Sequence, residues 1–427
     1  MNSIKLRLIA MNFLQFAVWG SYLTSMGTLL ASIGMQDKIG IFYAVQGIVS
    51  LFMPAVIGII ADRWVQAQRL LGICHAVAAL LMAATAYMVM TTAAAPNTSA
   101  ILGLYSLSVA FYMPTLALSN SVAYSVLESN KLDPVTAFPP IRVWGTIGFI
   151  CAMLLCDFAG FQQSAMQFWQ SAAIGIALGV YAFTLPSCAV NKSGEKKSLV
   201  ESLGLRAFTL FKDRKMAMFF IFSMLLGVSM QITNGFANPF ITSFGAIEEY
   251  SSTFAANHAN ALISISQISE TLCILLIPFF LKRFGIKTVM LIAMFAWVLR
   301  FGLFGVGNPG GGVWMFILSM IVYGVAFDFF NISGSLFVNK ETDASIRSSA
   351  QGLFMIMTNG IGATIGTLGA QQVVNHFVYS QSTPLARIEG WSTTWLVFAG
   401  YALVVALAFW VLFRYKHEPD KLGNINH

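Results

Sequence analysis

The 427-residue chain is 57% hydrophobic and only 10% charged, whereas soluble domains carry about 25% charged residues. So few polar residues cannot cover a water-facing surface of this size, and the composition therefore favours a helical membrane protein. The formal net charge is +7, but the basic residues are scattered over short loops, which excludes a nucleic-acid footprint. The cysteines have no metal-ligand or redox spacing, so we interpret them as small packing residues: Cys74, Cys151, Cys156, Cys188 and Cys273.

The first apolar run, 8–33, follows Lys5 and Arg7. It is longer than the core of a signal peptide, and at about 1.5 Å per residue it can cross about 30 Å of hydrocarbon, so we predict a retained transmembrane helix. Similar runs recur between short polar breaks, and none shows the two-residue alternation of a membrane strand. The sequence predicts twelve helices, at 8–33, 39–61, 69–91, 99–127, 141–161, 165–186, 216–244, 254–281, 285–306, 312–338, 347–378 and 391–413.

Basic residues alternate strongly between successive loops. One side of the predicted membrane has only Lys38 and Arg387. The positive-inside rule then places both termini and the polar segment 187–215 in the cytoplasm. The basic side contains Lys5, Arg7, Arg63, Arg69, Lys131, Lys192, Lys196, Lys197, Arg206, Lys212, Arg214, Lys215, Lys282, Arg283, Lys287, Lys340, Arg414, Lys416 and Lys421.

The segment 187–215 is the one long polar stretch, and it divides the predicted helices six and six. Two weak internal repeats support this division: 58–69 with 278–287, and 112–120 with 323–331. Paired halves of this kind are typical of secondary transporters that bind their cargo between the halves near the bilayer midplane. We predict an N-terminal six-helix bundle (1–190), a cytoplasmic linker (191–215), and a C-terminal six-helix bundle with a short cytoplasmic tail (216–427).

Four charged residues lie inside the predicted helices, where insertion costs about 2.5–3.5 kcal/mol each, so they are functional candidates by default. They are Arg142, Glu270, Arg300 and Asp328. Arg300 lies towards the periplasmic end of the predicted ninth helix, and we expect it to snorkel to the interface or to form a structural ion pair. The lone histidines His75 and His258 are expected to be packing residues.

Four predicted helices carry polar stripes with aromatic residues interleaved. Residues three or four apart share a helix face, so Arg142, Thr146 and Phe149 project to one side of the fifth helix. Such a lining suits a neutral ligand with a flat ring and several hydroxyls. Amides and carboxylates can bind the hydroxyls of a ribose and the edge of a base, and an aromatic face can stack on the base, which is worth about 1–3 kcal/mol. Alternatively, these residues form interhelical hydrogen bonds, each worth about 0.6 kcal/mol. The other stripes are Gln231 with Asn234, Gln267 with Glu270, and Tyr323 with Phe327, Asp328 and Asn331.

Glu270 and Asp328 are the predicted proton-coupling residues. Burial in low dielectric favours the neutral form of a carboxylate, which allows proton uptake from one side and release to the other. We expect at least one of them to be protonated when the loaded carrier turns over. A competing interpretation pairs one carboxylate permanently with Arg142 as a structural ion pair.

Several motifs resemble known families. The segment 58–69 is similar to the loop G-x-x-x-D-R-x-G-R-R between the second and third helices of the major facilitator superfamily, although Val65 and Gln66 stand where Gly and Arg are usual. Longer motifs resemble the nucleoside:H⁺ symporter family, and the resemblance extends from about Phe13 to His417. These longer motifs are 138–149, 219–227, 231–234, 264–271 and 323–334.

The resemblance implies a major facilitator fold and a proton-coupled carrier that imports nucleosides, such as uridine and adenosine, by alternating access. It implies a bacterial inner-membrane protein in a lipid bilayer, a monomer driven by the proton gradient without cofactor or metal. Asp62 and Arg63 would close a cytoplasmic gate. The residues implied to contact nucleoside are Arg142, Thr146, Phe149, Gln231, Asn234, Gln267, Glu270, Tyr323, Phe327 and Asp328.

The sequence contains no H-E-x-x-H motif, no Walker loop and no G-x-S-x-G elbow, so we do not predict an enzyme. Two other functions stay open: a carrier of a sugar or another polyol, and a membrane sensor that binds nucleosides without moving them. The aromatic residues in the stripes count against a sugar carrier. We find nothing resembling a signalling domain after the last predicted helix, which counts against a sensor.

Overall fold

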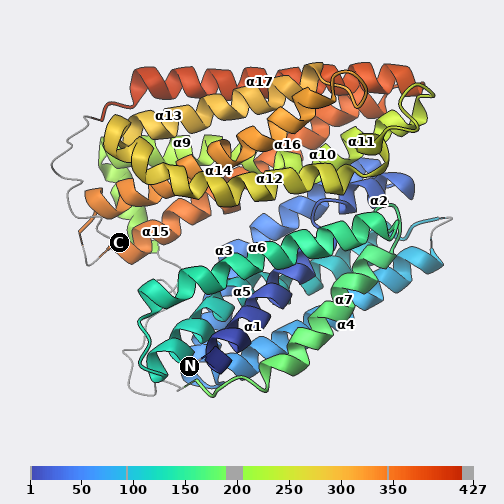
Figure 1. The fold of residues 1–427 in the computed structure, drawn as a ribbon. Helices are drawn as coiled ribbons and strands as arrows, with labels where there is room; N and C mark the ends of the chain where they lie inside the picture. The colour runs from blue at the N-terminus through green and yellow to red at the C-terminus, as the bar shows by residue number, and fades with distance from the viewer. Residues whose placement is uncertain (1, 93–94, 189–204, 344–345, 416–427) are drawn as a thin grey trace. The chain divides into compact units, whose positions relative to one another are not determined.

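The computed structural model describes residues 2–92, 95–188, 205–343 and 346–415. Their regular secondary structure is entirely helical (Figure 1), as the composition predicts. Within these ranges, nine helices are long and apolar enough to cross a membrane. The protein is therefore an all-α membrane protein.

The chain divides into two compact units. Unit 1 contains Met1–Ser202 and Asn234–Pro239, and unit 2 contains Leu203–Thr233 and Phe240–His427. The helices of unit 1 are α1 (Asn2–Gly20), α2 (Met26–Ser32), α3 (Ile39–Arg63), α4 (Ala67–Thr91), α5 (Thr98–Ser129), α6 (Pro134–Phe158) and α7 (Met166–Ala182). In this unit α1 packs against α6, and α4 packs against both α5 and α7.

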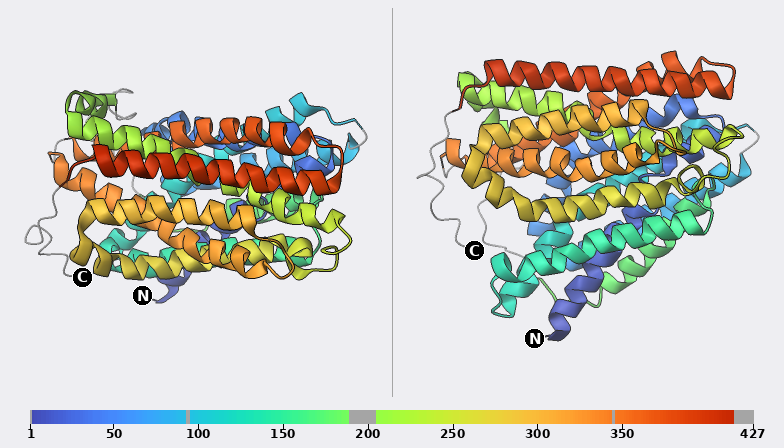
Figure 2. Two further views of the ribbon diagram at one scale, coloured as in Figure 1. Left: turned by 90° about the horizontal axis from the view of Figure 1, so that it is seen from above. Right: turned by 45° about the horizontal axis from the view of Figure 1, so that its top comes forward.

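Unit 2 is built around α13 and α14, which pack along each other, with α12 against α14 and α17 against α13. Figure 2 shows these long helices lying side by side in two further views. The helices are α9 (Arg214–Met230), α10 (Ile232–Ser243, whose residues 234–239 belong to unit 1), α11 (Phe254–Asn257), α12 (Ala259–Cys273), α13 (Ile277–Val306), α14 (Val313–Glu341), α15 (Arg347–Met355), α16 (Ala363–Val374) and α17 (Pro384–Leu412). A short 3₁₀ helix (Leu205–Lys212) precedes α9, and π-helical turns (Ile356–Gly362 and Asn375–Tyr379) flank α16.

The structure interrupts the predicted first and seventh helices. The predicted first helix is interrupted after Gly20, where the Ser21 hydroxyl donates to the Ala17 carbonyl. The predicted seventh helix is broken at Gln231, between α9 and α10. The predicted boundary between the eighth and ninth helices is a turn at Gly285, inside α13, whose φ of 79° is a conformation that glycine adopts without strain. Hydropathy does not reveal the breaks after Gly20 and at Gln231, because the predicted apolar runs 8–33 and 216–244 continue through both positions.

Glycines allow the closest helix approaches in each unit. In unit 1, a Cβ at Gly148 of α6 would lie 2.8 Å from the carbonyl carbon of Phe13 in α1 and nearer still to its oxygen. In unit 2, a Cβ at Gly227 of α9 would overlap the backbone of Thr358 in the same way. Small residues at helix crossings are the usual means of association in lipid, where backbones pack directly against each other.

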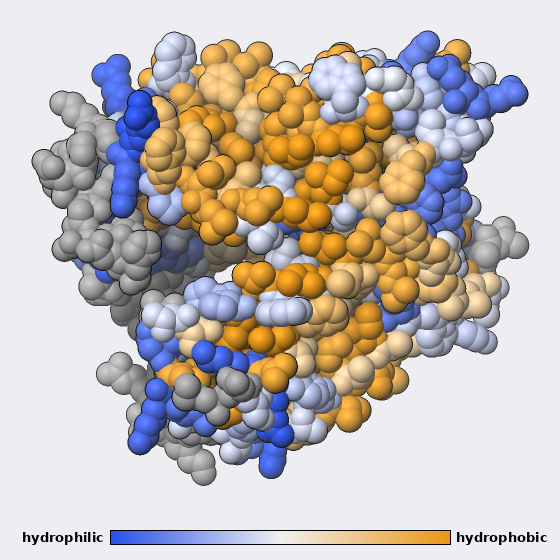
Figure 3. Space-filling model, viewed as in Figure 1, coloured by the Kyte–Doolittle hydropathy of each residue, from blue (hydrophilic) through white to orange (hydrophobic). Residues whose placement is uncertain are grey.

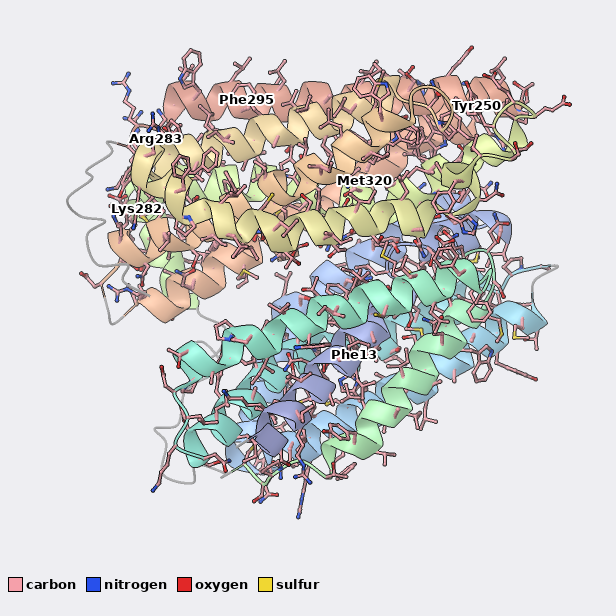
Figure 4. All side chains as sticks on the ribbon, viewed as in Figure 1. Phe13, Tyr250, Lys282, Arg283, Phe295 and Met320 are labelled. Carbon is pink, nitrogen blue, oxygen red and sulfur yellow. The ribbon has the colours of Figure 1, made fainter. Side chains whose placement is uncertain are left out.

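The surface of unit 2 has the polarity of a membrane protein. Figure 3 shows apolar side chains over the middle of its visible helices and polar side chains at their two ends. Lys282 and Arg283 lie at one end, and Tyr250 lies at the other (Figure 4). The exposed apolar side chains between them include Leu272, Leu275, Phe279, Phe295 and Leu299. Water would not accommodate a patch of this extent, so the middle of these helices faces lipid.

Candidate functional site

None of the ten predicted nucleoside-contacting residues is exposed. In unit 1, α6 carries Arg142, Thr146 and Phe149, and α10 carries Asn234. In unit 2, Gln231 lies at the α9–α10 break, α12 carries Gln267 and Glu270, and α14 carries Tyr323, Phe327 and Asp328. In unit 1 three of the residues lie on one helix, and in unit 2 the structure brings Glu270 of α12 near Tyr323 and Asp328 of α14.

The α6 residues of unit 1 are held by aromatic side chains of α1. The Arg142 guanidinium carbon lies 3.9 Å from the centroid of the Phe16 ring, a close cation–π contact. The Phe149 ring meets the edge of Trp19 at a centroid distance of 6.3 Å and an interplanar angle of 88°. Both residues therefore have defined positions within unit 1.

Trp19 is a candidate that the sequence analysis missed. Its indole nitrogen donates to Gln46 Oε1 at 3.3 Å, and Gln46 Nε2 donates to the Tyr105 hydroxyl at 2.8 Å. The indole is only partly buried, so part of its surface remains open beside Phe149. In the sequence Trp19 is one more residue of an apolar run, and only the packing of α1 on α6 distinguishes it.

In unit 2, a close contact between α12 and α14 brings the two acidic residues near each other. A Cβ at Gly324 would lie 2.6 Å from the Ser269 carbonyl oxygen, and the Ser269 hydroxyl donates to the Ile321 carbonyl. Ser269 precedes Glu270, and Gly324 is one turn before Asp328. The glycine therefore allows Glu270 and Asp328 to interact electrostatically.

Asp328 is buried, with 6% of its surface exposed. Its Oδ2 has no hydrogen-bond partner in the part of the chain that the structure describes. Two neighbouring carboxyl groups in a low-dielectric environment resist being ionised together, because each charge raises the cost of the other. The pair therefore has the chemistry needed to hold and release a proton.

Aromatic rings lie directly beside this acidic pair. Tyr323 and Phe327 of α14 stack with centroids 5.5 Å apart and planes inclined by 20°. Trp297 of α13 meets Tyr323 edge-on, at 5.9 Å and 90°. Tyr323 is buried and Phe327 is half-buried, so the Phe327 end of this stack offers the kind of flat apolar surface on which a nucleobase packs.

Gln231 and Asn234 lie where α9 passes into α10. Gln231 ends α9 and precedes α10, and Asn234 lies in the first turn of α10. Interrupted helices form the binding sites of many secondary transporters. The break therefore adds a structural feature to a position that the sequence marked only by its amide.

Arg300 corrects one sequence prediction. Its side chain is 2% exposed, and Nη1 donates to the Ser319 carbonyl at 2.7 Å. The prediction that Arg300 snorkels to the interface is therefore wrong, because the packing of α13 against α14 buries its guanidinium. It lies 4.6 Å from the centroid of the Tyr323 ring instead.

A small cavity of about 10 Å³ in unit 1 is lined by Tyr22, His75, Ser108 and Ser171, among others. This volume holds at most one water molecule and is far too small for a nucleoside. His75 Nε2 is hydrogen-bonded to Gln15 Oε1 at 2.7 Å. His75 is fully buried, which agrees with its interpretation as a packing residue.

Two predictions fall outside the described part of the chain. The backbone of Asp62 and Arg63 forms the end of α3, but their side chains lie outside the described residues, as does most of the predicted linker 191–215. Among the described residues, no group of three His, Cys, Asp or Glu side chains is placed to hold a metal ion.

The chain is similar to proteins of one transporter family. The model of the "Nucleoside H+ symporter" family matches residues 1–418. The chain is 48% identical to nucleoside permease NupG of Escherichia coli over 430 residues, covering 100% of both chains. It is 45% identical to the xanthosine permease of the same organism over 423 residues, covering 98% of each.

The solved structures agree with the sequence relatives. The crystal structure of nucleoside transporter NupG matches with a TM-score of 0.88 and 46% identity, covering 97% of this chain and 100% of that one. These relatives are transporters rather than enzymes. With a family model that spans nearly the whole sequence and a relative of this similarity over its full length, the chain belongs to the nucleoside–proton symporter family.

Proposed function

We propose that this chain imports nucleosides across a bacterial inner membrane together with protons. The observation that carries the proposal is the arrangement in unit 2, where the electrostatically coupled Glu270 and Asp328 lie beside the Tyr323–Phe327 stack. One cluster therefore contains groups suited to a proton and a surface suited to a base. Permeases for nucleosides and for xanthosine among its relatives support this cargo.

In the proposed mechanism, the base stacks on Phe327, the more exposed ring of the aromatic pair, while amide and carboxyl groups bind its edge and the ribose hydroxyls. Protonation of the acidic pair removes a charge that would be costly to carry through the membrane interior. The loaded, neutralised carrier then exposes its cargo to the cytoplasm by alternating access. The ten residues named from the family resemblance are the proposed contacts, and Asp62 with Arg63 is the proposed cytoplasmic gate.

The proposal extends to topology. One of the nine long helices, 259–306, turns at Gly285 and counts as two spans. The α1–α2 segment and α7 add two more, which gives twelve spans. We propose that these form two six-helix halves of the major facilitator type, 1–190 and 216–427, joined by a cytoplasmic linker at 191–215. The basic loops support cytoplasmic termini, and a monomer without cofactor suffices for this mechanism.

Uptake of labelled uridine into proteoliposomes tests the proposed function. We expect accumulation above equilibrium when an inward proton gradient is imposed, and none without it. Equilibration regardless of the gradient would show a nucleoside carrier that is not coupled to protons. Binding without uptake would favour a sensor, and uptake of a sugar or polyol in place of uridine would change the cargo.

Trp19 provides a prediction in unit 1. Replacing Trp19 with Ala removes an edge-to-face contact with Phe149, and such contacts are worth about 0.5–1.5 kcal/mol. We expect the Kd for uridine to rise about three- to tenfold, with a smaller rise for Trp19→Phe. Trp169, a tryptophan on the surface of α7, provides the matched control. Equal effects of Trp19→Ala and Trp169→Ala on the Kd would contradict a role for Trp19 in the site.

A further inference from the structure

Arg300 is enclosed by aromatic and backbone groups of unit 2. Its guanidinium carbon lies 4.6 Å from the centroid of the Tyr323 ring and 5.2 Å from that of Phe304. Nη1 donates to the Ser319 carbonyl, and the Ser319 hydroxyl donates back to the Arg300 carbonyl at 3.0 Å. Arg300 is thus tied to α14 one turn before Tyr323.

Its charge lacks the partner that a buried cation usually has. No ion pair joins Arg300 to a carboxylate within the described ranges, and its Nε has no hydrogen-bond partner there. Taking a cation out of water costs several kcal/mol, and apolar replacement of buried charges is often neutral or stabilising. Stability of the fold therefore does not account for a guanidinium at this position.

The contacts of Arg300 converge on the aromatic pair of the candidate site. Phe304, Arg300, Tyr323 and Phe327 form a continuous column, with successive separations of 5.2, 4.6 and 5.5 Å. Trp297, one turn before Arg300 on α13, restrains Tyr323 from another direction by its edge-on contact. The Tyr323 ring is therefore held in one orientation by two residues of α13.

We propose that Arg300 is a positioning residue for nucleoside binding. Its guanidinium holds the Tyr323 ring, and through it the stacked Phe327, as a rigid platform for the base. A platform that is already ordered loses less conformational entropy when the nucleoside binds. The inference rests on the proposed function and assigns a role to a residue outside the ten proposed contacts.

Substitution of Arg300 by Met separates positioning from stability. Met fills most of the same volume without the charge, and no backbone group is orphaned, since the Ser319 carbonyl remains within the α14 hydrogen-bond ladder. We expect the Kd for uridine, measured by calorimetry in detergent, to rise about tenfold. We expect the Tm to stay the same or to rise. A structural role predicts the reverse, a lower Tm with unchanged affinity, and that result would overturn the proposal.

Arg283 supplies the matched control. It also lies in α13, but before the turn at Gly285. Its guanidinium carbon is 5.7 Å from the centroid of the Phe284 ring, and both residues are exposed. Arg283→Met should leave both the Kd and the Tm unchanged. A rise in the Kd equal to that of Arg300→Met would show a general effect of lost charge and would contradict positioning.

A double-mutant cycle tests whether Arg300 acts through Tyr323. In a Tyr323→Leu background, Arg300→Met should change the Kd little further, because the ring that it positions is already missing. Additive losses would overturn the proposed route. If folded wild-type protein does not bind uridine at all, the proposed function fails, and the inference about Arg300 fails with it. If the wild type binds uridine and Arg300→Met binds it equally tightly, only the inference about Arg300 fails.

Discussion

Replacing Asp328 with Asn is expected to abolish proton-driven accumulation of uridine in proteoliposomes. The amide has nearly the same shape as the carboxyl group but cannot take up a proton. Asp328 is 6% exposed and interacts electrostatically with Glu270, so its neutralisation removes one half of the coupled pair. We expect uptake under an inward proton gradient to fall to the level of vesicles without protein.

Exchange of uridine at equal concentrations on both sides separates coupling from binding. Because Asn still offers an acceptor and resembles the neutral acid, we expect Asp328→Asn to retain exchange while losing accumulation. Glu270→Gln should also retain exchange and lose accumulation, since the two carboxyl groups take up and release the proton together. Glu389, an exposed acid at the start of α17, provides the control. Wild-type accumulation by a protein carrying both Asp328→Asn and Glu270→Gln would exclude these carboxylates from coupling.

Replacing Gly148 with Leu is expected to prevent unit 1 from folding. Even a Cβ at this position would lie 2.8 Å from the Phe13 carbonyl carbon and 2.9 Å from its Cα. Backbone atoms cannot rotate away as a side chain can, so α1 and α6 would have to separate. Overpacking by a few methylenes already costs about 1–3 kcal/mol, and here the whole helix crossing is lost. We expect no monodisperse protein after detergent extraction.

Gly148→Ala is a milder version of the same test. We expect the free energy of unfolding to fall by about 1–3 kcal/mol, which appears as a lower Tm. Gly103 in α5 is the matched control, because a Cβ there meets no atom within 4 Å. Alanine is a better helix former than glycine by about 1 kcal/mol, so Gly103→Ala should keep or raise the Tm. Equal effects of the two alanine substitutions would contradict the close α1–α6 approach.

Much of the fold could be predicted because a membrane restricts it so strongly. Every backbone group in hydrocarbon needs a partner, which leaves long apolar runs only the helix. The expected bounds of 39–61 and 99–127 therefore agree closely with α3 (Ile39–Arg63) and α5 (Thr98–Ser129). The break at Gln231 was not predicted, since the predicted apolar run 216–244 continues through it.

The sequence likewise predicted some features of the candidate site and missed others. The polar stripe on α14 could be read from helical periodicity, because Tyr323, Phe327 and Asp328 share a broad face of one helix. The family membership that the motifs predicted is confirmed, whereas the nucleoside contacts stay a prediction. Arg300 was interpreted wrongly, because helix periodicity does not say whether a neighbouring helix covers a side chain.

The sequence by itself determined that this protein is a helical membrane protein of the nucleoside–proton symporter family, and it determined which ionisable residues lie within the apolar helices. These properties follow from composition, periodicity and motifs, which are local. Only the tertiary structure decided that Trp19 contacts Phe149, that Gly324 lets Glu270 approach Asp328, and that Arg300 lies against Tyr323. Each of these contacts joins different helices, and their distances depend on how the backbones pack, which no single helix encodes.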